Sequence, residues 1–196
     1  MTDKSPSIRT VCVYCGSSPG HDPTYLNAAE SLGTGLAKSG ISLVYGGGGS
    51  GLMGKVATSC LAGNGQVTGI IPEFLLEWEQ NTGMDHLEGA EMIVVPDMHT
   101  RKREMFERSD AFIALPGGIG TLEELAEILT WAQLKRHTCP IFVLDINGFW
   151  SPMVDLVNHM DSEGFIHSVA DLKFQSVKDV ASLLDCLRDP RKVVQE

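Results

Sequence analysis

A glycine-rich loop that ends in a hydroxyl side chain lies at residues 115–121, between an apolar segment and a helical pattern. Gly117, Gly118 and Gly120 allow backbone N–H groups to point at an anion, and the start of the following helix adds a favourable dipole. Thr121 can cap that helix and can also offer its hydroxyl to a phosphate. The loop therefore predicts a phosphate-binding site.

The carboxylate of Glu124, which follows this loop, is open to two interpretations. Thr121 and Glu124 fit the capping box S/T-x-x-E, in which the glutamate only returns a bond to the cap backbone. Alternatively, Glu124 lies about one turn below the loop, roughly 5 Å along the helix axis, within reach of a ribose whose phosphate is anchored. A carboxylate near C1′ stabilises the positive charge that develops when a ribosyl C1′–N bond breaks, and it can activate water or attack directly. The spacing alone leaves both interpretations open.

A basic pair, Arg101 and Lys102, lies in the preceding helical pattern. At about 100° per residue, one stripe of that helix holds Met98, Lys102, Met105 and Phe106. Arg101 lies on the flank of this stripe and Arg103 well away from it, so we expect Arg101 and Lys102 near the sheet-facing side. Arginine cannot act as an acid or base at neutral pH. We therefore expect Arg101 to orient Glu124 or to bind ribose hydroxyls or phosphate, and we expect both cations to balance the nearby acids.

The elements that must position these residues follow from an alternation of apolar runs and helical patterns. Strands are predicted near 10–15, 41–45, 66–71, 91–95, 111–115 and 140–145. Helices are predicted near 23–39, 51–63, 98–109, 120–136, 151–162 and 177–188. This alternation implies one three-layer α/β/α domain over residues 1–196, with an ordered core at about 9–188 and a mostly parallel sheet.

Three glycine-rich loops follow predicted strands, at 16–20, 46–54 and 115–121. Ligands of parallel sheets bind outside the carboxyl ends of the strands. Tight turns favour glycine and serine in any case, but three such loops at one edge favour a ligand cleft.

The composition limits the class of partner. The 196 residues carry a net charge of −10 with a pI near 5.0, which argues against broad binding of a nucleic-acid backbone but not against a small anion. No apolar stretch approaches the roughly 20 residues needed to cross a bilayer, and the first residues lack the apolar run of a signal peptide. We therefore expect no nucleic-acid or membrane partner and a cytoplasmic location.

Five scattered cysteines do not resemble a disulfide framework: Cys12, Cys15, Cys60, Cys139 and Cys186. Cys12 and Cys15 form C-x-x-C inside a β-branched run, whereas redox proteins place that motif at a helix start. No second cysteine pair completes a zinc site. Buried structural thiols are therefore favoured over redox or metal use, and we expect neither a metal nor a cofactor.

A second nucleotide-binding pattern is present at Gly49, Gly51 and Gly54, which satisfy G-x-G-x-x-G. Glu73 follows after about 20 residues, where a ribose-binding acid lies in a dinucleotide fold. The motif follows the second strand instead of the first, so an NAD-binding oxidoreductase is a less favoured alternative. The long segment at 72–90 has the length of a lid or binding loop.

Two of these motifs resemble a known family. P-G-G-x-G-T-x-x-E at 116–124 and M-H-x-R-K-x-x-M at 98–105 look like the signatures of the LONELY GUY (LOG) family of cytokinin riboside 5′-monophosphate phosphoribohydrolases. Segments 15–18 and 45–48 also fit, and the resemblance covers about residues 9–188. It implies a Rossmann-like homodimer that cleaves the N-glycosidic bond of a nucleoside 5′-monophosphate to free base and ribose 5-phosphate. The family is often mislabelled lysine decarboxylase, but no lysine here is placed as a Schiff-base residue.

The resemblance also implies roles for single residues, with Arg101 and Glu124 as the catalytic pair. The substrate-binding residues that it implies are Ser17, Gly47, Lys102, Gly117, Gly118, Gly120, Thr121, Glu123 and Thr130. Glu77 and Glu79 are candidates for a further substrate contact, and no residue identifies itself as the acid for the departing base, although Asp97 and His99 lie nearby. Ile119 stands where plant members often have tyrosine, so both AMP and isopentenyladenosine monophosphate remain candidate substrates. Molybdenum-cofactor carriers are similar in fold and glycine loops, so a non-catalytic nucleotide or cofactor carrier is the main alternative.

Overall fold

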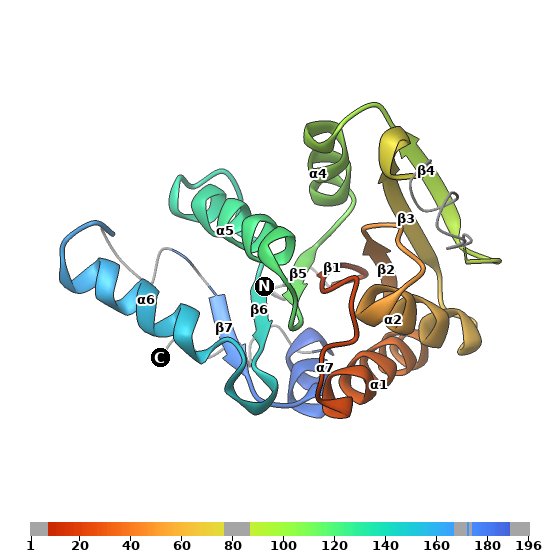
Figure 1. Cartoon of the computed structure of the whole chain (residues 1–196), viewed down its shortest axis with the longest axis horizontal. Helices are drawn as coiled ribbons and strands as arrows, with labels where there is room; N and C mark the ends of the chain where they lie inside the picture. The colour runs from red at the N-terminus through yellow and green to blue at the C-terminus, as the bar shows by residue number, and fades with distance from the viewer. Residues whose placement is uncertain (1–7, 77–86, 167–171, 173, 189–196) are drawn as a thin grey trace, which may run out of the picture.

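The computed structural model describes residues 8–76, 87–166, 172 and 174–188, which form one sheet with helices on both of its faces (Figure 1). The strands are β1 Thr10–Tyr14, β2 Ser42–Tyr45, β3 Val67–Pro72, β4 Glu91–Val95, β5 Ala111–Ala114, β6 Ile141–Leu144 and β7 Phe174–Val177. The α-helices are α1 Pro23–Ser39, α2 Gly51–Ala62, α4 Met98–Glu107, α5 Ile119–Gln133, α6 Ser151–Ser162 and α7 Val180–Arg188. A short 3-10 helix, η1 Ile146–Gly148, precedes α6.

The sheet is parallel throughout its described strands, in the order β4-β3-β2-β1-β5-β6-β7. The chain builds outward from β1 to β4 on one side and then returns to β5 on the other side of β1. β1 and β5 therefore form the switch point, where the loops that follow them diverge and a ligand crevice is expected. The predicted three-layer α/β/α arrangement is confirmed, and the sheet is more uniformly parallel than predicted.

Two apolar cores lie on opposite faces of the sheet. Helices α1, α2 and α7 cover one face, and α4, α5 and α6 cover the other (Figure 1). Side chains of β1 alternate between the two: Val11 and Val13 face the first core, while Cys12 and Tyr14 face the second. Because both faces are covered, the inner strands are apolar almost without interruption.

Local sequence signals explain the boundaries and packing of α1. The helix begins after Asp22, whose carboxylate accepts the Thr24 N–H, and it ends at Gly40, which has a left-handed φ of 67°. Gly33 lets α2 approach closely, because a Cβ there would lie 2.2 Å from the carbonyl oxygen of Val56. The close contact at Gly33 packs α1 against α2. Each of these helices follows one of the glycine-rich loops, α1 after 16–20 and α2 after 46–50.

The sequence prediction missed β7. Phe174–Val177 is an edge strand in which only the last residue is buried, so it lacks the continuous apolar run of the inner strands. The helix predicted near 177–188 begins at Val180, because β7 takes up the first of these positions. Within the described residues, no helix is both long and apolar enough to cross a membrane.

Candidate active site

Arg101 is a buried cation anchored near the ends of two strands. It lies in the first turn of α4, after the Asp97 cap, and its side chain is 10% exposed. Nε donates to the carbonyl oxygen of Ile70 in β3 at 3.2 Å, and Nη2 donates to that of Gly46, just after β2, at 3.4 Å. Nη1 contacts Sδ of Met98 at 3.7 Å. These contacts fix the plane of the guanidinium beside the carboxyl ends of β2 and β3.

Gly46 makes the room that this arginine needs. A Cβ on Gly46 would lie 2.1 Å from Nη2 of Arg101 and 3.2 Å from Sδ of Met53. The close approach of the guanidinium therefore requires a glycine at this position. Gly47, an expected substrate-binding residue, is buried with a φ of 82°, and its Cβ position lies 2.9 Å from Ile71. The turn after β2 thus forms part of the surface against which the Arg101 side chain packs.

Glu124 of α5 forms an ion pair with this arginine. Its Oε1 lies 3.4 Å from Nη2 of Arg101, and its side chain is also 10% exposed. Burial raises the pKa of the Glu124 carboxyl above its usual range, while the Arg101 guanidinium opposes the shift and Glu123 adds to it. A carboxyl perturbed by desolvation and by one specific charge partner is typical of functional sites.

The start of α5 differs from the prediction. Gly118 is the N-cap, without a side-chain capping bond, and the helix begins at Ile119. Thr121 therefore lies inside the first turn and does not cap the helix. The capping-box interpretation of Glu124 is wrong, because Glu124 lies one turn inside the helix and faces Arg101. The glycines already supply the turn into the helix, so no side-chain cap is needed there.

The first turn of α5 contains backbone donors that no described residue satisfies. Leu122 N donates to the carbonyl oxygen of Gly118 at 3.0 Å. The preceding N–H groups, of Ile119, Gly120 and Thr121, have no acceptor within the part of the chain that the structure describes. A Cβ at Gly118 or Gly120 would meet no atom within 4 Å. An uncapped helix start with open space in front of it is suited to an anion.

Gly117 is held between the side chain of Thr121 and the loop after β1. A Cβ on Gly117 would lie 2.1 Å from Oγ1 of Thr121 and 2.9 Å from the backbone nitrogen of Gly16. Thr121 is only 4% exposed, so it has little freedom to move away. The glycine at this position therefore serves the packing of the loop.

Hydrogen bonds tie the three glycine-rich loops together at one edge of the sheet, as predicted. Gly16 N donates to the carbonyl oxygen of Pro116 at 3.0 Å, which joins the loops after β1 and β5. The Ser50 hydroxyl donates to the carbonyl oxygen of Ser17 at 3.0 Å, which joins the loops after β1 and β2. Ser17 itself is exposed at this edge.

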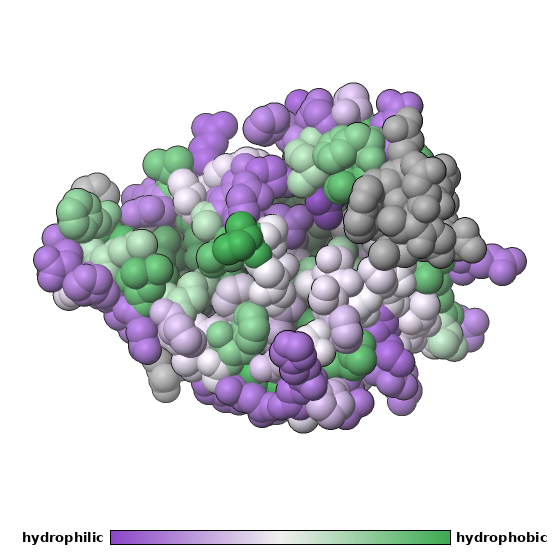
Figure 2. All heavy atoms as spheres, viewed as in Figure 1, coloured by the Kyte–Doolittle hydropathy of each residue, from purple (hydrophilic) through white to green (hydrophobic). Residues whose placement is uncertain are grey.

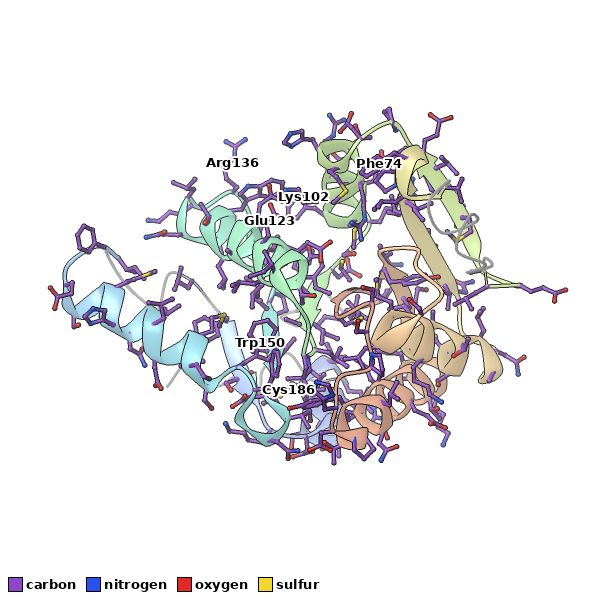
Figure 3. All side chains as sticks on the ribbon, viewed as in Figure 1. Phe74, Lys102, Glu123, Arg136, Trp150 and Cys186 are labelled. Atoms are coloured by element: carbon purple, nitrogen blue, oxygen red, sulfur yellow. The ribbon has the colours of Figure 1, made fainter. Side chains whose placement is uncertain are left out.

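Lys102, next to Arg101 on α4, bonds to two further acids of α5. Its Nζ lies 2.7 Å from Oε1 of Glu123 and 3.1 Å from Oε1 of Glu127, and Figure 3 shows Lys102 and Glu123 pointing toward each other. Partial burial lowers the pKa of Lys102, but the bonds to Glu123 and Glu127 outweigh it and the net shift is upward. Glu127 was expected from the sequence only as an acid flanking Glu124, not as a substrate-binding residue. Its i,i+4 spacing from Glu123 was the available signal, since it places both on one helix face.

The remaining expected site residues lie outside this group. Thr130 is exposed on α5, and its hydroxyl donates to the carbonyl oxygen of Ala126 at 2.8 Å. No contact among the described residues joins it to the Arg101–Glu124 pair, so its role stays a prediction. Glu77 and Glu79 lie outside the described residues.

Asp97 has a structural role at the start of α4. Its carboxylate accepts the Thr100 N–H at 2.8 Å. This bond lowers the pKa of Asp97, so the side chain stays ionised and is a poor proton donor to a departing base. His99, the other candidate acid, is exposed.

The first turn of α2 gives the G-x-G-x-x-G motif a packing role. Leu52 N and Met53 N both donate to the carbonyl oxygen of Gly16, at 3.0 and 3.2 Å. A Cβ on Gly54 would lie 2.0 Å from the carbonyl oxygen of Gly49, so the loop is closed against its own helix. In a dinucleotide site such N–H groups point at a pyrophosphate. Here they hold the loop after β1.

All five cysteines are free. Cys12 and Cys15 lie in separate cores on opposite faces of the sheet, which prevents them from sharing a disulfide or a metal ion. Burial raises the pKa of both thiols, as expected for structural cysteines. Within the described ranges, no group of His, Cys, Asp and Glu side chains is arranged to hold a metal ion.

The comparisons with known proteins identify the family of the chain. A family model described as possible lysine decarboxylase matches residues 53–187. A cytokinin riboside 5′-monophosphate phosphoribohydrolase of Arabidopsis thaliana, LOG2, is 42% identical over 189 residues, which are 96% of this chain and 87% of that protein. LOG of Oryza sativa subsp. japonica, which is also named a cytokinin riboside 5′-monophosphate phosphoribohydrolase, is 46% identical over 164 residues. These residues are 84% of this chain and 66% of that protein. The chain belongs to the LOG family. The resemblance expected from the two motifs is thereby confirmed.

Solved structures share the fold of this LOG-family chain at low sequence identity. The molybdenum cofactor binding protein of Rippkaea orientalis has a TM-score of 0.67 at 20% identity, covering 95% of this chain and 99% of that one. The Moco carrier protein of Chlamydomonas reinhardtii has a TM-score of 0.68 at 19% identity, covering 94% and 98%. At these identities the likeness is one of fold.

Proposed function

We propose that this LOG-family protein hydrolyses the N-glycosidic bond of a nucleoside 5′-monophosphate, releasing an adenine-type base and ribose 5-phosphate. The observation that carries the proposal is the buried Arg101–Glu124 pair, about one helical turn from the unused N–H groups of α5. The names of relatives that are 42% and 47% identical support the same reaction.

The phosphate of the substrate is expected at the start of α5. Gly118 and Gly120 leave open space there, and the N–H groups of Ile119, Gly120 and Thr121 supply donors that have no acceptor among the described residues. Backbone donors suit this task because the two nearby cations, Arg101 and Lys102, are already paired with three glutamates of α5. With the phosphate so placed, the ribose lies along the first turns of α5 toward Glu124.

Glu124 and Arg101 have different tasks in the proposed reaction. As the C1′–N bond breaks, its electron pair leaves with the base and positive charge builds at C1′. The Glu124 carboxylate stabilises that charge, and it either accepts a proton from the attacking water or bonds to C1′ itself before water completes the hydrolysis. Arg101 stays protonated and holds the carboxylate in place.

Release of free base from AMP by the purified protein, without added metal, tests the proposal. Glu124→Gln and Arg101→Ala should each abolish turnover, and Glu124→Gln should largely keep nucleotide binding. Glu107→Gln is the matched control, because this glutamate pairs with the exposed Arg103 on the outer side of α4. Full activity in both site variants would overturn the assignment, and tight binding without base release would support the non-catalytic carrier instead.

The identity of the base requires a direct comparison of substrates. The relatives are named for cytokinin riboside 5′-monophosphates. We therefore expect isopentenyladenosine monophosphate to be cleaved as well as AMP. The ratio of kcat/KM for these two nucleotides measures the preference, and a ratio near one would show that the prenyl group is not recognised.

We also propose a homodimer in the cytoplasm. Large apolar side chains are exposed on α6 and beside it, at Leu156, Met160 and Phe165, and Figure 2 shows apolar residues gathered at this end of the molecule. Five free cysteines fit a reducing compartment. Light scattering should give twice the chain mass, and Leu156→Glu with Met160→Glu should reduce it to that of a monomer.

A further inference from the structure

Lys102 bonds to two carboxylates of α5. Its side chain is 12% exposed, and its Nζ bonds to Glu123 at 2.7 Å and to Glu127 at 3.1 Å. The two glutamates are more accessible, at 51% and 28%. The lysine is therefore a largely buried cation whose two hydrogen bonds both end on side chains of the same neighbouring helix.

The charges between α4 and α5 are arranged as two cations facing three anions. Arg101 forms an ion pair with Glu124, and Lys102 forms ion pairs with Glu123 and Glu127. The five groups sum to −1 before any substrate is present. A nucleoside monophosphate adds a further charge near −2. The site therefore has little positive charge to spare, and each of the two cations is already bonded to acids.

We propose that Lys102 is a positioning residue for the hydrolysis proposed above, which holds Glu123 and Glu127 and thereby lets the neighbouring Glu124 work as a carboxylate beside Arg101. The inference rests on the proposed function for its kinetic test. It assigns Lys102 to the acids of α5, whereas its place beside Arg101 in the motif suggests direct contact with the substrate.

The surroundings of Glu124 explain why such a residue is needed. Burial raises the pKa of this carboxyl, and the charges of Glu123 and Glu127 raise it further. Arg101 and Lys102 lower it. Among the described residues, the other titratable groups that interact with this carboxyl are on β1 and just after it: Cys12, Tyr14 and Cys15. Because burial keeps these groups neutral, the neighbouring acids and the two cations decide the protonation of Glu124.

A direct bond from Lys102 to the substrate phosphate would have a cost. The ammonium would have to leave Glu123 and Glu127, and these two acids would then lack their cation beside an incoming dianion. Like charges left unbalanced at short range are destabilising. The free N–H groups of α5 bind the phosphate without that rearrangement.

The test compares the pH dependence of kcat in the wild type, Lys102→Gln and the double variant Lys102→Gln/Glu127→Gln. We expect Lys102→Gln to move the acid limb of kcat to higher pH, with a loss on the order of three- to tenfold on the acid side and little change in KM. The double variant should return the limb toward the wild type, because it removes one of the two uncompensated acids. A different result in Lys102→Gln would overturn the proposal: an increased KM with an unchanged acid limb of kcat, and no return of KM toward the wild type in the double variant. That result would identify Lys102 as a direct ligand of the substrate.

A titration of Glu124 that needs no turnover separates this proposal from the reaction. The ¹³C carboxyl resonance of Glu124, assigned by its loss in Glu124→Gln, should titrate at higher pH in Lys102→Gln than in the wild type. This holds even if the protein proves to release no base, and an unmoved resonance would refute the role of Lys102 alone. Lys55→Gln is the matched control, because Lys55 pairs with Glu30 on the opposite face of the sheet and should leave the resonance unchanged. Lys102→Arg, which keeps the charge, guards against misfolding and should retain the wild-type titration.

Discussion

The guanidinium of Arg101 and the carboxylate of Glu124 meet across the space between α4 and α5, with Nη2 of the arginine 3.4 Å from Oε1 of the glutamate. The arginine is also bonded to the carbonyl oxygens of Ile70 and Gly46. The position of the carboxylate is thereby linked to the ends of β2 and β3, two strands that are paired with each other in the sheet. This linkage makes the geometry of the ion pair sensitive to small changes in the backbone at Gly46 and Ile70.

Glu124→Gln should increase the thermal stability at neutral pH. The folded-state pKa of Glu124 is raised above its unfolded value, so its contribution to stability is complete below the unfolded pKa and is lost as the pH rises through the folded pKa. The glutamine avoids the cost of an ionised buried group. We therefore expect a higher Tm than that of the wild type at pH 7. The gain should shrink as the pH falls toward 4, and a gain that grew on acidification would contradict the raised pKa.

Gly46→Ala should disable the site while leaving the fold intact. The added methyl carbon would lie 2.1 Å from Nη2 of Arg101, so the guanidinium must move and loses its geometry with Glu124. A displacement of about 1 Å at a catalytic group can cost 10²-fold in rate, so kcat should fall by about that factor. Binding of ribose 5-phosphate should change little, because the N–H groups of α5 are not altered. Wild-type kcat in this variant would show that the close packing of Arg101 against Gly46 is not required.

Arg101→Lys should behave as a severe substitution. A lysine ammonium cannot reproduce the planar fork that reaches Ile70, Gly46 and Glu124 together. We expect kcat to fall by about 10²-fold or more. Arg103→Lys is the matched control on the same helix, because its partner Glu107 lies on the exposed side, and it should keep full activity. Substantial activity in Arg101→Lys would mean that charge alone suffices.

Alanine substitutions in the glycine loop should separate phosphate binding from packing. At Gly118 and Gly120 the added methyl would meet no protein atom within 4 Å, so the fold should be unaffected, whereas KM for the nucleotide should rise by about tenfold through obstruction of a charge-assisted hydrogen bond. Gly117→Ala should instead lower Tm, because its methyl would lie 2.1 Å from Oγ1 of Thr121. Thermal melts and KM values for the three variants check this. An unchanged KM in both Gly118→Ala and Gly120→Ala would remove the phosphate from the start of α5.

Much of the architecture could be predicted from the order of residues alone. Apolar runs and helical patterns repeat along the chain, and this alternation is sufficient to indicate a parallel sheet with its loops at one edge. The strand β7 was missed because an edge strand buries little of its surface and carries a weak apolar signal. The cap of α5 was misplaced because a glycine turn can start a helix without the side-chain bond that Thr121 was expected to make.

The sequence by itself determined which residue types are present and which face of each helix they share. Periodicity placed Arg101 and Lys102 near the buried side of α4, and the motifs indicated the family. Only the tertiary structure decided the partners of these cations. Arg101 pairs with Glu124 and two strand-end carbonyl groups, and Lys102 pairs with Glu123 and Glu127. The physical reason is that a sequence pattern encodes the burial of one element, whereas an ion pair between two helices depends on how the sheet beneath them sets their relative position.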